Sequence, residues 1–191
     1  MRWTVAVLIL LLLCSVASAN AQEQKNELMV TAGVGTFQDI VEGIGNIGVL
    51  IATMGFAHTE TDMVTPVIGV HYKRNLNNWL SLGGTFNYQQ FERKFFVMDE
   101  VVGKTDINYY TFMGRCDFTY LRTSIFRMYS GVSAGLCAAT ESGTGVESDS
   151  VYWFAFHLNA LGMRLGKQIA AVFELGFGYD GIIAGGVSYD F

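Results

Sequence analysis

The sequence is short of the residues that build several common classes of protein. Only 15% of its 191 residues are charged, it has a single proline, and its three cysteines do not suggest a disulfide framework. Basic residues are also in deficit, with 12 Lys and Arg against 17 Asp and Glu, which argues against nucleic acid as a partner. Yet 51% of the residues are hydrophobic, and this combination is typical of a membrane protein.

A long hydrophobic run is present only at the start of the chain. The segment MRWTVAVLILLLLCSVASANAQEQ has an early cation, Arg2, then an apolar run and then small residues. Ala17-Ser18-Ala19 fits an A-x-A cleavage site, and a second site would cleave after residue 21. We therefore predict a secretory signal peptide over residues 1–19 and one domain over residues 20–191. A lipoprotein signal is disfavoured because three leucines precede Cys14, where small residues are needed.

After the signal, the sequence lacks any apolar stretch of the roughly 18 residues that a membrane-spanning helix needs. A closed β-barrel is the other structure that satisfies every backbone polar group in lipid. Its signature is a series of segments of alternating hydrophobicity, separated by turns. Eight segments fit this pattern: 27–35, 62–73, 79–92, 107–121, 126–138, 151–163, 170–180 and 182–191.

The character of the polar positions separates a membrane barrel from a soluble β-sandwich. A sandwich carries Lys and Glu freely on its outer face, whereas the polar face here is mostly Ser, Thr, Asn and Gly. Such residues suit the cramped interior of a small barrel. The sequence thus predicts an all-β fold, a closed eight-stranded antiparallel up-and-down transmembrane β-barrel, with a soluble sandwich or barrel as the alternative.

The links between the segments alternate in length. Short links are expected at 74–78, 122–125 and 166–168, and long loops at 36–61, 93–106 and 139–150. Outer-membrane barrels have short periplasmic turns and long extracellular loops, so both termini are expected in the periplasm.

Aromatic residues gather near both ends of the segments, as expected for side chains at two membrane interfaces. The inner group is Tyr72, Trp79, Phe118, Tyr120, Phe126, Tyr189 and Phe191; the outer group is Tyr88, Phe91, Tyr109, Tyr110, Tyr152, Phe154 and Tyr179.

The first long loop contains a second pattern. Over residues 37–54, apolar residues such as Ile40 and Ile44 recur at near-helical spacing, with Asp39 and Glu42 on the other side. This pattern favours a short amphipathic helix at the membrane surface or over the barrel mouth, although its glycines weaken the prediction. An irregular loop or longer flanking strands are the alternatives.

Charged side chains on the inward face must be paired, because an eight-stranded barrel is filled by side chains. We expect a polar network in the lumen, with Arg115 and Glu174 at similar depth. Its predicted members are His71, Lys73, Arg115, Asp117, His157 and Glu174.

Catalytic and metal sites are weakly supported. Histidines and carboxylates of this set are of the right types for zinc, but their spacing matches no local motif. A Ser133, His157 and Asp117 triad would face a sealed lumen. Cys116 is expected on the outer face and Cys137 on the inner face, which excludes a disulfide. We predict no catalytic, metal or cofactor site and no cofactor.

The stretches FELGFGYDGIIAGGVSYDF and YKRNLNNWLSLGGTFNY resemble small outer-membrane β-barrel domain proteins of Gram-negative bacteria, broadly of the eight-stranded OmpA/OmpX type. The resemblance covers nearly the whole mature chain and implies a cell outer-membrane location. It also implies that the barrel-assembly machinery reads the last strand, here through Phe191 with Val187 and Tyr189.

The predicted function is accordingly structural or a surface interaction rather than catalysis. The expected partners are outer-membrane lipid or lipopolysaccharide and, during insertion, the assembly machinery; the barrel is expected to be a monomer. The alternatives are a lipid-modifying outer-membrane enzyme of the lipid A deacylase or acyltransferase type, which needs a nucleophile and base at the lipid-facing rim, and a small-solute pore.

Overall fold

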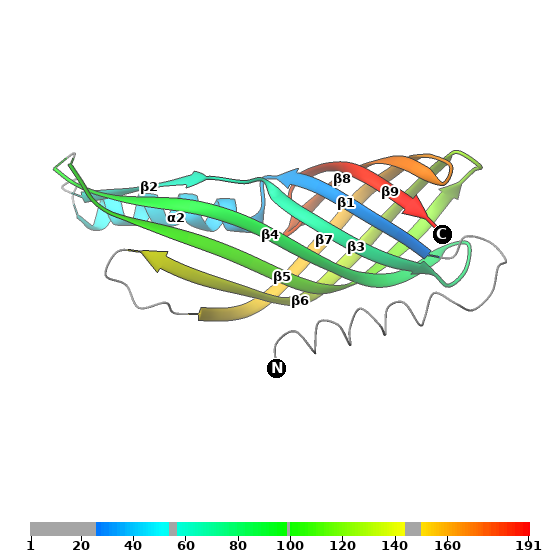
Figure 1. The fold of residues 1–191 in the computed structure, drawn as a ribbon, viewed down its shortest axis with the longest axis horizontal. Coiled ribbons are helices and arrows are strands. Elements are labelled where there is room, and N and C mark those ends of the chain that lie inside the picture. Colours follow the sequence, from blue (N-terminus) through cyan, green and yellow to red (C-terminus); the bar gives the residue numbers. More distant parts are fainter. Residues whose placement is uncertain (1–25, 54–56, 99, 144–149) are drawn as a thin grey trace.

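A computed structural model describes residues 26–53, 57–98, 100–143 and 150–191. Nine strands and one helix form an elongated barrel with a projection at one end (Figure 1). The elements are β1 (Asn26–Val34), α2 (Phe37–Ala52), β2 (Ala57–Met63), β3 (Val67–Asn75), β4 (Leu80–Val97), β5 (Glu100–Arg122), β6 (Phe126–Gly143), β7 (Ser150–Gly166), β8 (Ile169–Gly178) and β9 (Ile183–Asp190). The predicted signal peptide lies outside the described residues.

The sheet closes on itself, because every described strand except β2, which pairs with β4 alone, has at least two antiparallel neighbours. β1 pairs with β3 on one edge and with β9 on the other, and β4 pairs with β5 to complete the circle. At the seam, Asn26 and Phe191 exchange two backbone hydrogen bonds of 3.0 and 2.8 Å. Closure leaves no unpaired sheet edge in the barrel wall, as a membrane-spanning sheet requires.

Nine strands make an eight-stranded barrel because β2 and β3 are two pieces of one barrel strand. Both pair with β4, β3 along its first half and β2 along its second half. Between them, residues 64–66 include Pro66, which has no backbone N–H to donate. The amides of Val64 and Thr65 both donate to the carbonyl oxygen of Gln90, so the break is a local bulge that leaves the wall continuous.

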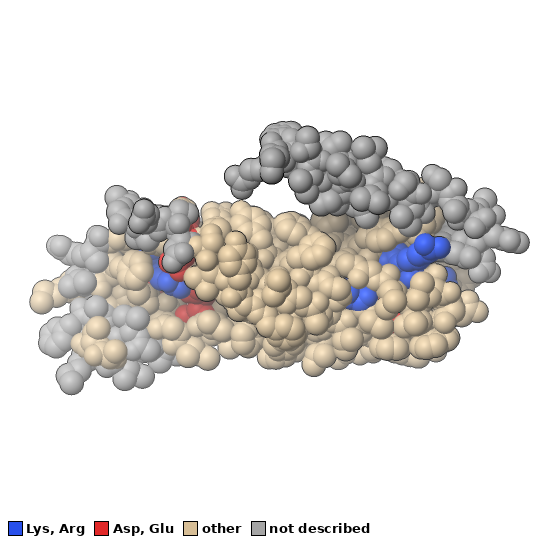
Figure 2. Space-filling view, turned by 90° about the horizontal axis from the view of Figure 1, so that it is seen from below, with Lys and Arg blue, Asp and Glu red and all other residues tan. Residues whose placement is uncertain are grey.

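The alternation expected from the sequence sets the inner and outer faces. In β3, Ile68 and Val70 point outward while Gly69 and His71 point inward. The predicted closed eight-stranded antiparallel barrel is confirmed. Figure 2 shows the result on one face of the molecule: a broad belt without charged residues, with Lys and Arg at one end and mixed charges at the other.

The expected long loop at 93–106 is wrong, and the one expected at 139–150 is wrong over residues 139–143, while residues 144–149 lie outside the described residues. β4 and β5 continue as a hairpin to Val97 and Glu100, and β6 continues to Gly143. The expected loop 36–61 contains the favoured helix, α2, followed by most of β2, which was not expected as a strand. The apolar alternation fades in these stretches because strands that leave the lipid have no apolar face to maintain. Regular backbone pairing continues all the same.

Three residues expected in the outer aromatic group also face the interior. Phe91, Tyr109 and Tyr179 are buried, at 2%, 7% and 1% exposure. The other members, such as Tyr110 and Phe154, are exposed on the outer face. Phe91 and Tyr109 share the parity of the lumen-facing Gln89 and Thr111, so strict alternation places them inside.

Of the alternatives for residues 37–54, the favoured helix is confirmed, and it spans Phe37–Ala52. Thr36 and Asp39 form a reciprocal cap at its start: the Asp39 amide donates to Thr36 Oγ1 at 3.2 Å, and the Thr36 amide donates to Asp39 Oδ2 at 2.6 Å. Among the described residues, no helix has the length and apolar character needed to cross a membrane.

The belt gives a direct test of which face meets lipid. Val70 lies on the outer face between Tyr72 and the level of Tyr88, near the middle of the belt. Val70→Arg is expected to lower the free energy of unfolding by about 2–4 kcal/mol, because a charge would enter the centre of the bilayer. Urea unfolding in phospholipid vesicles measures this change.

The matched control is Val41→Arg, which places the same substitution on the exposed side of α2. It is expected to leave the unfolding midpoint unchanged. An equal loss of stability in both variants would contradict the assignment of the belt.

Candidate functional site

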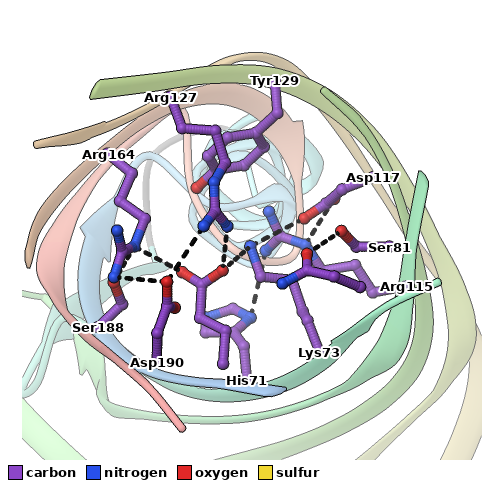
Figure 3. A network of polar contacts seen from close by, with 12 residues as sticks. His71, Lys73, Ser81, Arg115, Asp117, Arg127, Tyr129, Arg164, Ser188 and Asp190 are labelled. Carbon is purple, nitrogen blue, oxygen red and sulfur yellow. Dashed lines mark hydrogen bonds and ion pairs between the residues drawn. The ribbon is translucent and has the colours of Figure 1, made fainter. Parts of the chain in front are cut away.

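The lumen near the start of β1 and the end of β9 is filled by a network of charged side chains (Figure 3). Arg127 donates to Glu27 Oε2 at 2.8 Å and to Asp190 Oδ2 at 3.1 Å. Arg164 lies 3.0 Å from Asp190 Oδ2 and donates to Ser188 Oγ at 2.9 Å. These residues come from β1, β6, β7 and β9, so the ion pairs tie distant parts of the wall together across the lumen.

A second group lies deeper in the barrel, around Arg115. Its guanidinium pairs with Asp117 at 2.9 Å and with Glu174 at 2.5 Å. Lys73 joins the two groups, at 3.0 Å from Asp117 and 3.6 Å from Glu27. Because all of these groups are buried, their charges are compensated by each other rather than by water.

Neutral groups complete the hydrogen bonding of this second group. Tyr129 donates to Glu174 Oε1 at 2.6 Å, and Asn159 donates to the same oxygen at 3.1 Å. Two glycines make room for these side chains. A Cβ at Gly131 would collide with the Asp117 carboxylate, and one at Gly162 would collide with the Tyr129 ring.

The structure brings five of the six predicted lumen residues into contact. His71 lies against Arg115 Nη1 at 3.3 Å and bonds to the hydroxyl groups of Thr31 and Thr85. His157 does not contact the Arg115 group directly, but Asp180 lies between them, with its Oδ2 3.9 Å from His157 Nε2 and 3.9 Å from Arg115 Nη1.

The predicted set omitted Glu27, Arg127, Arg164 and Asp180, all of which are buried in the lumen. Alternation in their strands carried a signal for the first three: Arg127 and Arg164 each lie between two apolar residues, and Glu27 precedes the outward Leu28. Asp180 lies in the turn between β8 and β9, where alternation gives no information.

The residues considered for catalysis do not assemble. Ser133 and His157 are cross-strand neighbours, but the Asp117 carboxylate bonds to Arg115 and Lys73 instead of His157. His58, the histidine nearest the outer rim, stacks on Phe96 with ring centroids 4.7 Å apart. Within the described part of the chain, no group of three or more His, Cys, Asp or Glu side chains is arranged to hold a metal ion. Cys116 and Cys137 are both free thiols.

Above the polar network the lumen becomes apolar. A cluster that includes Phe91, Ile107, Met113 and Tyr179 fills the barrel, and Phe37 at the start of α2 packs against it. The Phe37 ring lies 5.7 Å from that of Tyr179. The first residue of the helix thus fills the end of the barrel opposite the start of β1.

Past this cluster, part of the wall continues as a structure that we call the extension. It consists of β2 with residues 92–97 of β4, 100–106 of β5 and 140–143 of β6. On the other side of the barrel, β1, β8 and β9 end at the level of Val34, Gly178 and Ile183. Figure 1 shows α2 lying alongside the extension.

The helix attaches to the extension by its polar side. Glu42 is buried and accepts two hydrogen bonds from Arg93, at 2.8 and 2.6 Å, and one from Tyr109 at 2.7 Å. Asn46 accepts a hydrogen bond from Thr59 at 2.8 Å. The apolar side is turned outward, and Ile44 is 65% exposed.

The outer surface of the extension carries ion pairs across neighbouring strands. Lys94 on β4 pairs with Asp62 on β2 at 2.9 Å, and Glu92 lies 3.5 Å from Lys104 on β5. The hydrogen bond from Lys94 lowers the pKa of the Glu92 carboxyl, and the hydrogen bond to Asp62 raises the pKa of Lys94. The cations of this surface are thus matched by acids on adjacent strands.

The role of Arg115 in stability can be measured. Arg115→Leu leaves Asp117 and Glu174 buried with fewer positive partners, which is expected to cost about 3–5 kcal/mol of folding free energy. The melting temperature of the barrel in detergent, read as loss of the heat-modifiable band on gels, is expected to fall.

Lys104→Leu is the control for this substitution. Lys104 is 59% exposed and pairs with Glu92 at the surface, so its loss is expected to leave the melting temperature unchanged. A melting temperature for Arg115→Leu equal to that of the control would refute a structural role for the network.

Comparison with known proteins finds solved structures and one protein family that are similar to this chain. Two solved structures of Ail, the attachment invasion locus protein of Yersinia pestis, are similar to this chain. The structure in complex with the heparin analogue sucrose octasulfate has 15% identity and a TM-score of 0.47, and the other has 16% identity and a TM-score of 0.41. Each alignment covers 87% of this chain and 99% of the other.

A comparison with curated protein sequences gives no match. The model of one protein family, described as "Outer membrane protein beta-barrel domain", matches residues 6–190. This match spans almost the whole chain, and the closed barrel with its uncharged belt agrees with it. The chain belongs to the outer membrane protein β-barrel domain family and is a protein of the outer membrane.

Proposed function

We propose that this barrel holds the extension and α2 at the cell surface, where they bind molecules outside the cell. The observation that carries the proposal is the unequal height of the wall. Four neighbouring strands continue beyond the belt while β1, β8 and β9 end near it. Regular paired strands beyond the membrane are unnecessary for anchoring, so their retention favours a role outside it.

The attachment of α2 supports the same function. The buried contact of Glu42 with Arg93 and Tyr109 fixes the helix against β4 and β5. A partner would therefore meet a rigid surface, which lowers the entropic cost of binding.

The rival functions have less support. The lumen is occupied by ion pairs and by the apolar cluster, which opposes a role as a solute pore. A lipid-modifying enzyme needs a nucleophile and a base together at the rim, and the described rim residue His58 contacts Phe96. We also propose that the barrel is a monomer whose neighbours are outer-membrane lipid and lipopolysaccharide.

The proposal requires both termini in the periplasm and the extension outside. Met98, at the tip of the β4–β5 hairpin, is 78% exposed. In Met98→Cys, a membrane-impermeant maleimide is expected to label intact cells, because the new thiol lies outside the outer membrane.

The matched variant is Lys167→Cys, in the β7–β8 turn at the opposite end. Its labelling is expected only after the outer membrane is permeabilised, and wild-type protein reports the background from Cys116 and Cys137. Labelling of Lys167→Cys on intact cells, with none of Met98→Cys, would reverse the orientation.

The function of the extension is tested by removing it. Phe91 and Ile107 are cross-strand partners, so residues 92–106 can be replaced by an Asn-Gly turn that closes the hairpin at that pair. Cells that display wild-type protein are expected to attach to surfaces coated with serum or extracellular-matrix proteins, and cells with the shortened hairpin to attach at the level of cells without the protein.

Surface display of both proteins is equalised by labelling before the comparison. Equal attachment by the two, or no attachment by wild type, contradicts the proposed function.

A further proposal concerns insertion. Val187, Tyr189 and Phe191 are exposed on the outer face of the closing strand, and the rings of Tyr189 and Phe191 stack with centroids 5.9 Å apart. We propose that the barrel-assembly machinery recognises this surface before closure. Phe191→Ala is expected to lower the amount of protein in the outer membrane several-fold while leaving the melting temperature of inserted barrels nearly unchanged. Wild-type amounts of this variant would contradict the proposal.

A further inference from the structure

A pocket of about 350 Å³ opens at the end of the barrel where β1 begins and β9 ends. It lies among the β5–β6 turn, the β7–β8 turn and the end of β9. The residues of its lining that matter here are Arg122, Arg127, Arg164, Lys167 and Asp190. Its volume equals that of about a dozen water molecules, which is enough for a small polar group.

The lining carries more positive than negative charge. Arg122, Arg127, Arg164 and Lys167 are cations, and Asp190 is the only acid among the described lining residues. Arg127 and Arg164 are buried at the floor and hold Asp190 and Glu27, whereas Arg122 and Lys167 are exposed at the rim. The rim therefore favours an anion.

The floor of the pocket favours a cation or a hydrogen-bond donor, because it presents the Asp190 carboxylate. Asp190 is 4% exposed, and its Oδ2 receives both arginines. Its Oδ1 is buried and meets no hydrogen-bond donor among the described residues. Figure 3 shows the Asp190 carboxylate facing Arg127 and Arg164 through one side only. A ligand that donates hydrogen bonds to Oδ1 would satisfy this oxygen.

The level of the pocket in the membrane narrows the choice of ligand. Phe126 belongs to its lining, and the exposed Tyr120, Tyr189 and Phe191 lie on the outer face at the same end of the barrel. Aromatic side chains in such positions mark the interface between hydrocarbon and water. The pocket thus lies at the height of the phospholipid head groups.

We propose that this pocket binds the head group of phosphatidylethanolamine, which carries an anion and a primary ammonium a few bonds apart. The phosphate lies against Lys167 and Arg122 at the rim, and the ammonium donates to Asp190 Oδ1 at the floor. The bound lipid ties the two turns and the closing strand together at the inner leaflet. The inner-leaflet assignment rests on the proposed orientation of the barrel, but the binding itself does not.

The test is native mass spectrometry of the purified full-length protein in detergent, with equal concentrations of phosphatidylethanolamine and phosphatidylcholine. The two lipids share the phosphate, but the quaternary ammonium of phosphatidylcholine has no N–H to donate. Wild type is expected to retain phosphatidylethanolamine about tenfold more. Equal retention of the two lipids overturns the proposal.

Substitutions at the rim test whether phosphatidylethanolamine binds in this pocket. The double variant Arg122→Gln with Lys167→Gln is expected to lose about tenfold in retained phosphatidylethanolamine, whereas Lys104→Gln, at the far end of the molecule, is expected to behave as wild type. A double variant that retains as much lipid as the control overturns the proposal.

Asp190→Asn tests the floor, and only heat-modifiable, folded protein is compared. This variant is expected to bind the two lipids equally, since it loses the preference for a primary ammonium. Added inorganic phosphate that displaces the lipid at equal concentration would show a simple anion site and would overturn the head-group assignment. None of these outcomes depends on the attachment assay, so failure here leaves the proposed surface function untouched.

Discussion

The structure depends on one constraint: backbone polar groups in hydrocarbon must be paired within the protein. The sequence meets it by closing β1 onto both β3 and β9, so the wall has no edge. Closure with eight strands leaves a narrow lumen, and a narrow lumen cannot hydrate buried charges. The ion pairs of Arg115, Lys73, Arg127 and their carboxylates are therefore a consequence of closure as well as a support for it.

Because the interior is filled, we propose that the barrel functions through its two ends. At the end nearest α2, the apolar cluster and Phe37 close the barrel, and the extension with α2 projects beyond it. At the opposite end, the charges that line the lumen reach the surface at Asp190, Arg127 and Arg164 and form the floor of an open pocket. The two ends of the barrel thus differ in chemistry: one carries a rigid projecting surface and the other a polar pocket.

The sequence predicted which strand residues face lipid and which face the lumen, because the bilayer imposes that alternation. It predicted less of the structure outside the membrane. In the membrane, alternation has a physical cause on both faces, so the outward Val70 and the inward Arg115 could be assigned from spacing alone. Beyond the lipid, nothing requires one face of a strand to be apolar. Residues 92–94 of β4 are charged on both faces, with Glu92 and Lys94 on one and Arg93 on the other, so the sequence there resembles a loop.

The Thr36 and Asp39 cap was a readable signal for the start of α2. The direction of its polar side could not be predicted, because it depends on Arg93 and Tyr109, which are distant in sequence and bind Glu42. Asp180 lies in a turn, where no local pattern indicates its burial.

We propose that side chains seal the lumen and that the barrel acts through its ends. Ion conductance in planar lipid bilayers tests this proposal most directly. With the purified protein inserted, which antibody binding to the membrane verifies, we expect no unit conductance steps above those of the bare bilayer. Steady, reproducible steps from wild-type protein would contradict it, because they would require a continuous aqueous path past Arg115 and the apolar cluster.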